Sequence, residues 1–265
     1  MLPSAAAISS ATWLIGSIIG HAAGGFLIAF LGINKTFYVI LFFVITGYLL
    51  LTRLGTKPVL VTAPSRTWQS VKEGLDYVFK TKEILGALSL DLFAVLFGGA
   101  VALVPVFAKD ILHIGPIGFG WLNAATDIGS IITVTILTIR PLHAKQGRIL
   151  FFAVGAFGAC IILFALSKVF WLSFAALLMS GCMDGISVIV RGTILQLKTP
   201  DELRGRVMSV NSMFINSSNE LGQFESGVMA KLMGTVPSVV FGGCMTIAVV
   251  LFTWFKAPSL RKMEY

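Results

Sequence analysis

Six side chains that can gain or lose a proton lie inside long apolar stretches of this sequence. They are His21, Asp91, Asp127, Asp184, Glu220 and Glu225, and no lysine or arginine lies in the interior of the same stretches. A charged group in hydrocarbon is costly, so such residues normally face a cavity or a partner. Carboxyl groups without basic neighbours suit reversible protonation, because burial disfavours their charged form. The pattern therefore indicates proton exchange at buried sites.

Three of these residues lie nearest the middle of their stretches and are candidates for proton coupling: Asp127, Glu220 and His21. Histidine titrates close to neutral pH even in an ordinary environment, which suits it to the same role. A second interpretation stays open for each of the three, namely a hydrogen bond that only joins two helices. Glu225 is interpreted in this second way.

Asp91 and Asp184 lie near one end of their stretches, which suggests a different role. Asp184 precedes Arg191 by seven residues, so the two share a helical face. We interpret both acids as members of ion pairs that close a cytoplasmic gate. Their partners would be basic residues of the neighbouring connections: Arg148, Arg191, Arg204 and Arg206.

The stretch from Thr199 to Gly234 predicts a long helix with one polar face. Thr199, Pro200 and Glu202 form a helix-start signal of the capping-box type. Four polar residues then recur at steps of four, three and four, which places them on one face: Ser212, Asn216, Asn219 and Gln223. Glu220 lies beside this stripe. Because lipid cannot satisfy such groups, we expect the helix to line a wet cavity.

The composition identifies the class of protein that positions these residues. Hydrophobic residues make up 56% of the chain and charged residues 12%, about half the share of a soluble domain. Eight apolar segments follow one another, most of them near the length of about 20 residues that crosses a bilayer. They are 5–31, 34–52, 85–108, 118–138, 149–166, 169–190, 207–229 and 237–255. The sequence therefore predicts an all-α polytopic membrane protein with eight transmembrane helices.

The basic residues fall on alternate connections. Segments 53–82, 140–148, 191–206 and 256–262 hold six, three, four and three of them, whereas the other connections hold one each: Lys35, Lys109, Lys168 and Lys231. This alternation follows the positive-inside rule and predicts that both termini are cytoplasmic. The net charge of +8 is therefore a mark of topology, and no nucleic acid is expected as a partner.

A glycine pattern near the start of the chain recurs near its end. Gly20, Gly24, Gly25 and Gly32 match Gly222, Ser226, Gly227 and Gly234 at a constant offset of 202 residues. The match predicts a parallel repeat of six helices, as in many transporters, although chance similarity of glycine-rich helices is the alternative. The chain would then begin at the fifth of twelve helices. Gly16, Gly20, Gly24 and Gly25 would let a neighbouring helix approach closely.

The repeat divides the chain into three parts. Residues 1–52 would be the last two helices of a first bundle, 53–84 a cytoplasmic linker, and 85–265 a second bundle of six helices. Five apolar residues of the linker share one face of a short helix: Trp68, Val71, Leu75, Val78 and Phe79. The other face carries Arg66, Lys72, Glu73 and Lys80, so the helix should lie on the inner membrane surface.

Several segments together resemble the major facilitator superfamily, in the branch that includes the bacterial enterobactin exporter. Residues 16–25 resemble the family's antiporter motif G-x-x-x-G-P-x-x-G-G, with His21 where proline is usual. Ile139–Arg148 resembles its cytoplasmic gating motif, with Gly147 and Arg148 but without its acid. Segments 89–112 and 191–210 resemble this branch specifically. The resemblance implies helices 5–12 of a major facilitator fold around a central cavity.

These observations favour a secondary transporter over an enzyme. The sequence has no H-E-x-x-H, G-x-S-x-G or nucleotide-binding loop and no paired-cysteine metal site, so we expect no cofactor and no metal. We expect proton-coupled efflux of small amphipathic molecules, drug-like or siderophore-like, across a bacterial inner membrane. Partners would be the lipid bilayer, a small-molecule substrate, and helices upstream or another copy of the chain. The alternative is a truncated or split fragment that does not transport alone.

Overall fold

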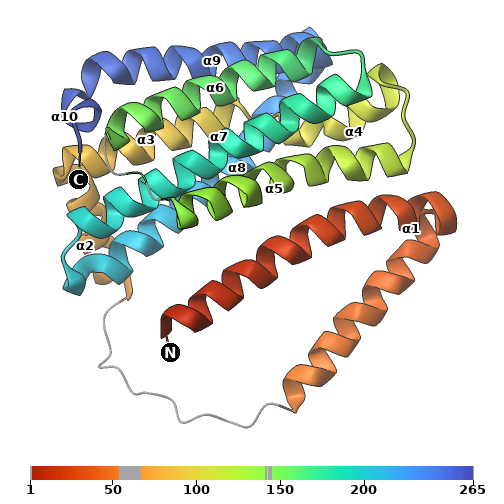
Figure 1. Cartoon of the computed structure of the whole chain (residues 1–265), viewed down its shortest axis with the longest axis horizontal. Coiled ribbons are helices and arrows are strands. Elements are labelled where there is room, and N and C mark those ends of the chain that lie inside the picture. Colours follow the sequence, from red (N-terminus) through yellow and green to blue (C-terminus); the bar gives the residue numbers. More distant parts are fainter. Residues whose placement is uncertain (1, 54–66, 141, 143–144, 265) are drawn as a thin grey trace.

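A computed structural model describes residues 2–53, 67–140, 142 and 145–264, and every element in this part of the chain is helical (Figure 1). The elements are α1 (Leu2–Thr52), α2 (Thr67–Lys80), α3 (Lys82–Phe97), η1 (Ala100–Leu103), α4 (Val104–Val106), η2 (Phe107–Ile111), α5 (Pro116–Ile139), α6 (Gln146–Leu166), α7 (Phe170–Lys198), α8 (Asp201–Met233), α9 (Thr235–Lys256) and α10 (Pro258–Arg261). The long helices pack side by side, and α1 contacts the bundle through α5.

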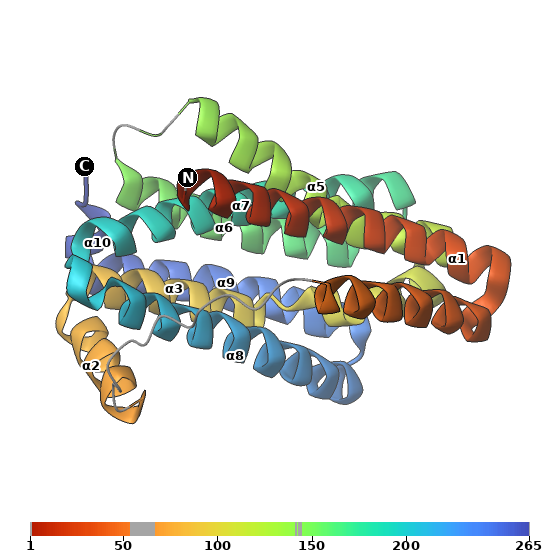
Figure 2. The same ribbon diagram turned by 90° about the horizontal axis from the view of Figure 1, so that it is seen from below.

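The helix α1 is two helices joined by a sharp bend at Gly32. Gly32 has φ 75° and ψ 167°, and the chain folds back there (Figures 1 and 2). Gly234, between α8 and α9, has nearly the same conformation, with φ 92° and ψ 160°. Glycine adopts this region without the steric penalty of other residues. The predicted repeat pairs these two glycines, and the repeat itself stays a prediction.

The predicted segment 85–108 is a broken helix. The helix α3 ends at Phe97, and Pro105 lies in the first turn of α4, where a proline is tolerated. At the break the backbone N–H of Gly98 donates to the carbonyl of Ala94 (2.7 Å), and that of Ala102 donates to the carbonyl of Gly99 (3.4 Å). Side chains of neighbouring helices add a second donor to each of these carbonyls. Thr246 Oγ1 donates to the carbonyl of Ala94 (3.2 Å), and Ser226 Oγ donates to that of Gly99 (3.2 Å). Such compensation is what permits a helix to break within a membrane.

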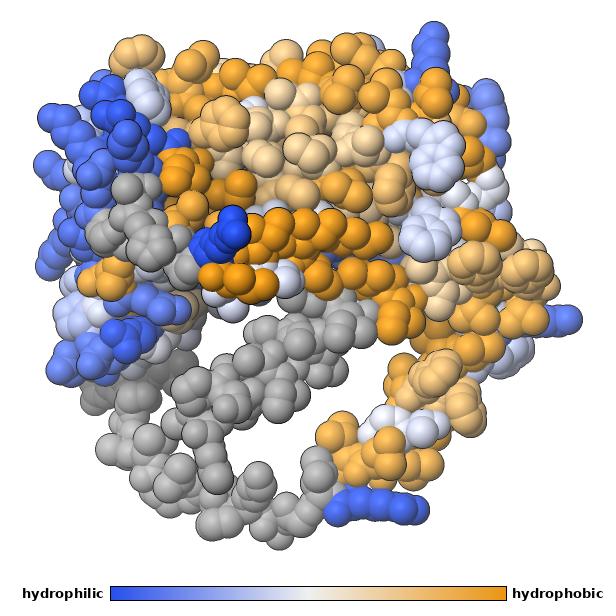
Figure 3. Space-filling model, viewed as in Figure 1, coloured by the Kyte–Doolittle hydropathy of each residue, from blue (hydrophilic) through white to orange (hydrophobic). Residues whose placement is uncertain are grey.

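Five helices of the described part are long and apolar enough to cross a membrane. They are Gly16–Thr52, Pro116–Ile139, Gln146–Leu166, Phe170–Lys198 and Thr235–Lys256. The first of these contains the bend at Gly32. The broken α3 and the 33-residue α8, which carries the polar stripe, fall outside the five. The chain is thus an all-helical membrane protein, and the number of eight spans stays a prediction. Apolar side chains cover the middle of the face shown in Figure 3.

The predicted capping box at the start of α8 does not form. Pro200 is the N-cap residue, α8 begins at Asp201, and no side chain caps it. The hydroxyl of Thr199 is buried and has no hydrogen-bond partner. The predicted helix start was therefore correct to within two residues, but its proposed hydrogen bond is absent.

The linker helix α2 packs against the beginning of α8. Gly74 lies against the backbone of Arg206, and Tyr77 donates a hydrogen bond to the carbonyl of Lys198. Glu73 forms an ion pair with Arg206. Val78 is fully buried, whereas the side chain of Trp68 is 79% exposed. The predicted apolar face is thus divided between protein contact and an outward surface; Arg66 lies outside the described residues.

The two ends of the bundle differ in what they carry. The bend of α1 and the helix α4 lie at one end, whereas α2, α10 and the C-terminal end lie at the other (Figures 1 and 2). Hydrophilic side chains gather strongly at the end that carries α2 and α10 (Figure 3). This arrangement agrees with the alternation of basic residues along the sequence.

We expect single cysteines at five exposed lysines to report the orientation in a background with the native cysteines replaced by alanine. Four positions should react with an impermeant maleimide from outside intact cells, namely Lys35, Lys109, Lys168 and Lys231. A cysteine at Lys145 should react only after the membrane is opened, because the basic connections stay inside. All five side chains are exposed, so a difference in labelling reports sidedness. The reverse pattern would contradict the predicted topology.

Candidate substrate cavity

A cavity of about 260 Å³ lies where the break after α3 meets α5, α6, α7 and α8. Its polar lining consists of Thr126, Asp127, Ser130, Ser180, Asp184, Asn219 and Gln223. The apolar lining includes Val95 and Phe157, and glycines at three positions bring backbone to the surface. In the part of the chain that the structure describes, no lysine, arginine or histidine lines the cavity. The cavity is therefore amphipathic, with two carboxyl groups and amide and hydroxyl groups around one aromatic ring.

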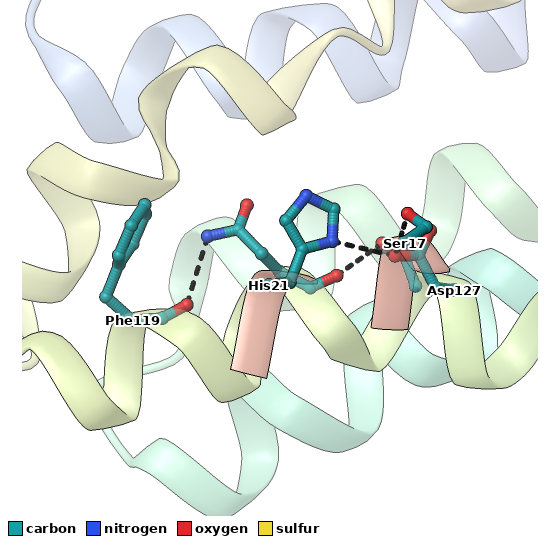
Figure 4. A network of polar contacts seen from close by, with 6 residues as sticks. Ser17, His21, Phe119 and Asp127 are labelled. Carbon is teal, nitrogen blue, oxygen red and sulfur yellow. Dashed lines mark hydrogen bonds and ion pairs between the residues drawn. The ribbon is translucent and has the colours of Figure 1, made fainter. Parts of the chain in front are cut away.

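Asp127 joins the cavity to α1 (Figure 4). Its Oδ2 accepts a hydrogen bond from Ser17 Oγ at 2.7 Å and lies 2.7 Å from His21 Nδ1. The side chain of Asp127 is 20% exposed and that of His21 is 47% exposed. Two of the predicted proton-coupling residues are thus in direct contact, although they are more than one hundred residues apart in sequence.

The contact between α1 and α5 depends on two glycines. A Cβ atom on Gly25 would lie 2.6 Å from the carbonyl oxygen of Pro116, and one on Gly120 would lie 2.7 Å from that of His21. By contrast, Cβ atoms on Gly16, Gly20 and Gly24 would meet nothing within 4 Å. Gly25 is therefore the residue of the predicted packing motif that makes the close contact with α5 in this structure.

Arg191 pairs with Asp91, not with Asp184. The Arg191 guanidinium and the Asp91 carboxylate form an ion pair between α7 and α3, with side chains only 5% and 9% exposed. The sequence suggested Asp184 because it shares a face with Arg191. Residues seven apart are separated by about 10 Å along a helix, so a direct pair between them is disfavoured. The neighbouring helix brings a carboxylate much closer than the same helix can.

A small inner pocket of about 10 Å³ adjoins the cavity and shares Val95, Phe157 and Asp184 with it. Its lining also includes Asp91 and Ser187. The hydroxyl of Ser187 is buried and has no hydrogen-bond partner, and its residue is 3% exposed. Asp184 therefore faces both spaces.

The polar stripe of α8 reaches the cavity at two positions, Asn219 and Gln223. The other two stripe residues, Ser212 and Asn216, are exposed and do not line it. Glu220 is exposed, and among the described residues it makes no ion pair or side-chain hydrogen bond. In Glu225, the neighbour of Ser226, one carboxylate oxygen is buried without a partner.

The predicted gate residues divide into separate contacts. Arg206 pairs with Glu73 of the linker helix, and Arg204 pairs with Asp201 at 2.5 Å on the exposed start of α8. Arg148 is exposed at the start of α6. The buried pair of Asp91 and Arg191 is the only one of these that borders the inner pocket. Their joint action as a gate stays a proposal.

Several lining residues were not singled out from the sequence. Thr126 and Ser130 flank Asp127 on one face of α5, and on α7 Ser180 and Ser187 lie four residues before and three residues after Asp184. This spacing was a readable signal, because small polar residues at helical intervals form a polar face. Phe157 had no such signal, since aromatic residues in apolar helices are common.

Comparisons with known proteins identify the family. The family described as Transmembrane secretion effector matches residues 1–265. The uncharacterized MFS-type transporter YfmI of Bacillus subtilis (strain 168) is 22% identical over 255 residues, 93% of this chain and 62% of YfmI. The enterobactin exporter EntS of Citrobacter koseri is 25% identical over 266 residues, 99% of this chain and 63% of EntS. The chain thus spans about 62% to 63% of the length of these relatives. It belongs to the major facilitator superfamily of transporters, in its enterobactin exporter-like branch.

Proposed function

We propose that this chain carries the substrate cavity of a proton-coupled exporter of small amphipathic molecules in a bacterial inner membrane. One observation carries the proposal: a cavity of about 260 Å³ whose lining combines two carboxyl groups, two amides and an aromatic ring. Ligand cavities usually have such a lining, mostly apolar with a few convergent polar groups. The enterobactin exporters among the relatives make export the favoured direction.

Asp127 is the first candidate for the proton-coupling group. It lines the cavity, so water and substrate can reach it, and the same carboxylate contacts Ser17 and His21 of α1. A proton on Asp127 would weaken its attraction to a protonated His21 and alter the contact between α1 and α5. This gives a local route from protonation to a change in helix packing, which is what coupling requires. Glu220 is the second candidate, because it lies beside the polar stripe.

Two conservative substitutions test the assignment of the proton site. We expect Asp127→Asn to reduce the pH-gradient dependence of transport at least tenfold, because asparagine keeps the shape but cannot exchange the proton. The chain is reconstituted in proteoliposomes, a pH gradient is imposed, and export of three fluorescent probes is followed: ethidium (cation), anilinonaphthalene sulfonate (anion) and phenylnaphthylamine (neutral). Glu220→Gln is the matched substitution on α8. Full proton dependence in Asp127→Asn together with its loss in Glu220→Gln would move the site to Glu220.

The competing hypothesis, a membrane-embedded chain that does not transport alone, gives a different result in the same vesicles. It predicts that the probes bind to the protein but do not move against their gradient at any imposed pH difference. Binding without export would therefore favour the fragment hypothesis, and export of any of the three probes would exclude it.

A further inference from the structure

We propose that the cavity recognises an organic monocation and that Asp184 and Phe157 form its binding point. The inference rests on the proposed function, because it assumes that this cavity is the substrate site. It adds the charge of the substrate and the residues that select it.

The charge of the lining favours a cation. Among the described residues that line the cavity, Asp127 and Asp184 are the only ionisable ones. The arginine closest in sequence to the α7 part of the lining, Arg191, is already paired with Asp91. An anionic ligand would meet the Asp184 carboxylate, which has no ion-pair partner among the described residues, and such an arrangement is strongly disfavoured away from bulk water. The Asp127 carboxylate differs, because it lies against His21.

Asp184 is the carboxyl group that is free to bind a ligand. Asp127 already accepts a hydrogen bond from Ser17 and contacts His21. Asp91 is held by Arg191. Asp184 makes neither a side-chain hydrogen bond nor an ion pair with any other described residue. A half-buried carboxylate without a partner is unfavourable unless something positive or a proton joins it.

The inner pocket supplies a second, independent sign of a missing partner. The Ser187 hydroxyl lines this pocket together with Asp184, is buried, and has no hydrogen-bond partner. Buried hydroxyl groups are normally satisfied, so an unsatisfied one beside a cavity points to a partner that binds there. The pocket has a volume of about 10 Å³, near the space that one water molecule needs. Ser187 and Asp184 can therefore hold a water that extends the polar contact of a bound cation.

Phe157 supplies the other half of the binding point. It lines both the cavity and the inner pocket, as Asp184 does. The face of an aromatic ring attracts a cation, and the attraction grows when water is excluded. Together with Val95, the ring gives apolar surface for the remainder of the ligand. An anionic and an aromatic side chain at the junction of two spaces would suit a quaternary ammonium or similar lipophilic cation.

Equilibrium binding of two small probes to the purified chain in detergent tests the inference. The probes are phenyltrimethylammonium and benzenesulfonate, which have similar size and opposite charge, and calorimetric titration measures both. We expect only the cation to bind. Asp184→Asn should weaken its binding at least tenfold, and Phe157→Leu about twofold to thirtyfold, the range of a cation–π contact. Asp110→Asn is the matched control, because Asp110 is exposed on η2 and does not line the cavity.

Further variants separate a lost contact from a lost fold. Asp184→Glu keeps the charge and should retain most of the affinity, whereas a variant with a damaged fold would also lose its thermal transition. Equal binding of benzenesulfonate, no binding of either probe, or an unchanged affinity in Asp184→Asn would overturn the inference. In the vesicle assay, export of the anionic or neutral probe but not of ethidium would contradict the proposed cation selectivity. The proposed function as an exporter would still hold. Binding of the cation that depends on Asp184, without export of any probe, would support the inference and contradict the proposed function.

Discussion

Replacing Gly181 with alanine is expected to lower the free energy of unfolding by about 3 kcal/mol, the upper end of the usual range for overpacking. A Cβ atom at this position would lie 2.0 Å from the carbonyl oxygen of Thr126 on α5. The obstacle is backbone, so no side-chain rotation can relieve it. Separating the two helices would also break the hydrogen bond from Ser130 Oγ to the carbonyl of Gly181, now 3.0 Å. Titration of the protein in mixed micelles with a denaturing detergent, followed by circular dichroism, measures the change.

Two further substitutions test whether the loss of stability comes from the close packing of α5 on α7. Gly129→Ala approaches the same helix pair from the other side, since its Cβ atom would lie 2.0 Å from the carbonyl oxygen of Leu178, and it should destabilise to a similar extent. Gly192→Ala is the matched control on α7, because its Cβ atom meets nothing within 4 Å. There the higher helix propensity of alanine should make the change neutral or favourable by up to about 1 kcal/mol. Similar stabilities for Gly181→Ala and Gly192→Ala would contradict the close packing of α5 on α7.

Neutralising one member of the buried pair is expected to have the second large effect. Arg191→Met should lower the free energy of unfolding by about 3–5 kcal/mol, because Asp91 would be left buried without its partner. The two side chains are only 5% and 9% exposed, so water cannot take the place of the lost charge. The same titration in mixed micelles measures the loss, and binding of phenyltrimethylammonium reports whether the adjoining cavity survives.

A double substitution shows whether the stability comes from the ion pair or from other contacts of Arg191. Asp91→Leu together with Arg191→Met removes both charges and should recover most of the lost stability, since well-packed apolar groups often replace a buried ion pair without cost. The exposed pair of Arg204 and Asp201, with side chains 48% and 81% exposed, is the comparison. Arg204→Met should change the stability by no more than about 1 kcal/mol. A double variant as unstable as Arg191→Met alone would show that the arginine acts through other contacts.

The comparison of α7 and α8 shows how far local pattern predicts a membrane fold. The segment 169–190 corresponds to α7, Phe170–Lys198, and 207–229 to α8, Asp201–Met233. The apolar core of α7 was predicted but its extension over residues 191–198 was not, whereas α8 follows the helix predicted between Thr199 and Gly234 because a helix-start signal marked its beginning. Hydropathy reports the part of a helix that lies in lipid and carries little information on where the helix continues beyond it.

The proton-coupling candidates show likewise that the sequence identifies residues but not their contacts. Asp127 and His21 were selected because each is an ionisable residue near the middle of an apolar stretch, and the structure places them 2.7 Å apart. Their spacing in sequence contains no sign of this contact. Glu220 was selected by the same rule, yet it does not line the cavity. The rule finds residues that are costly in lipid, but it does not tell which surface of the helix faces the cavity.

The membrane class, the helical architecture, the interruptions between segments near Gly32 and Gly234, and the ionisable residues from which the site is built could all be predicted from the sequence. These depend on composition and on periods of a few residues, which any one segment contains. Three features could not be predicted without the packed helices: Arg191 pairs with Asp91, the helix of segment 85–108 breaks after Phe97, and Asp184 faces the cavity without an ion-pair partner among the described residues. Each of these depends on the rotation and depth of one helix against another, and these are set by packing between segments far apart in the chain.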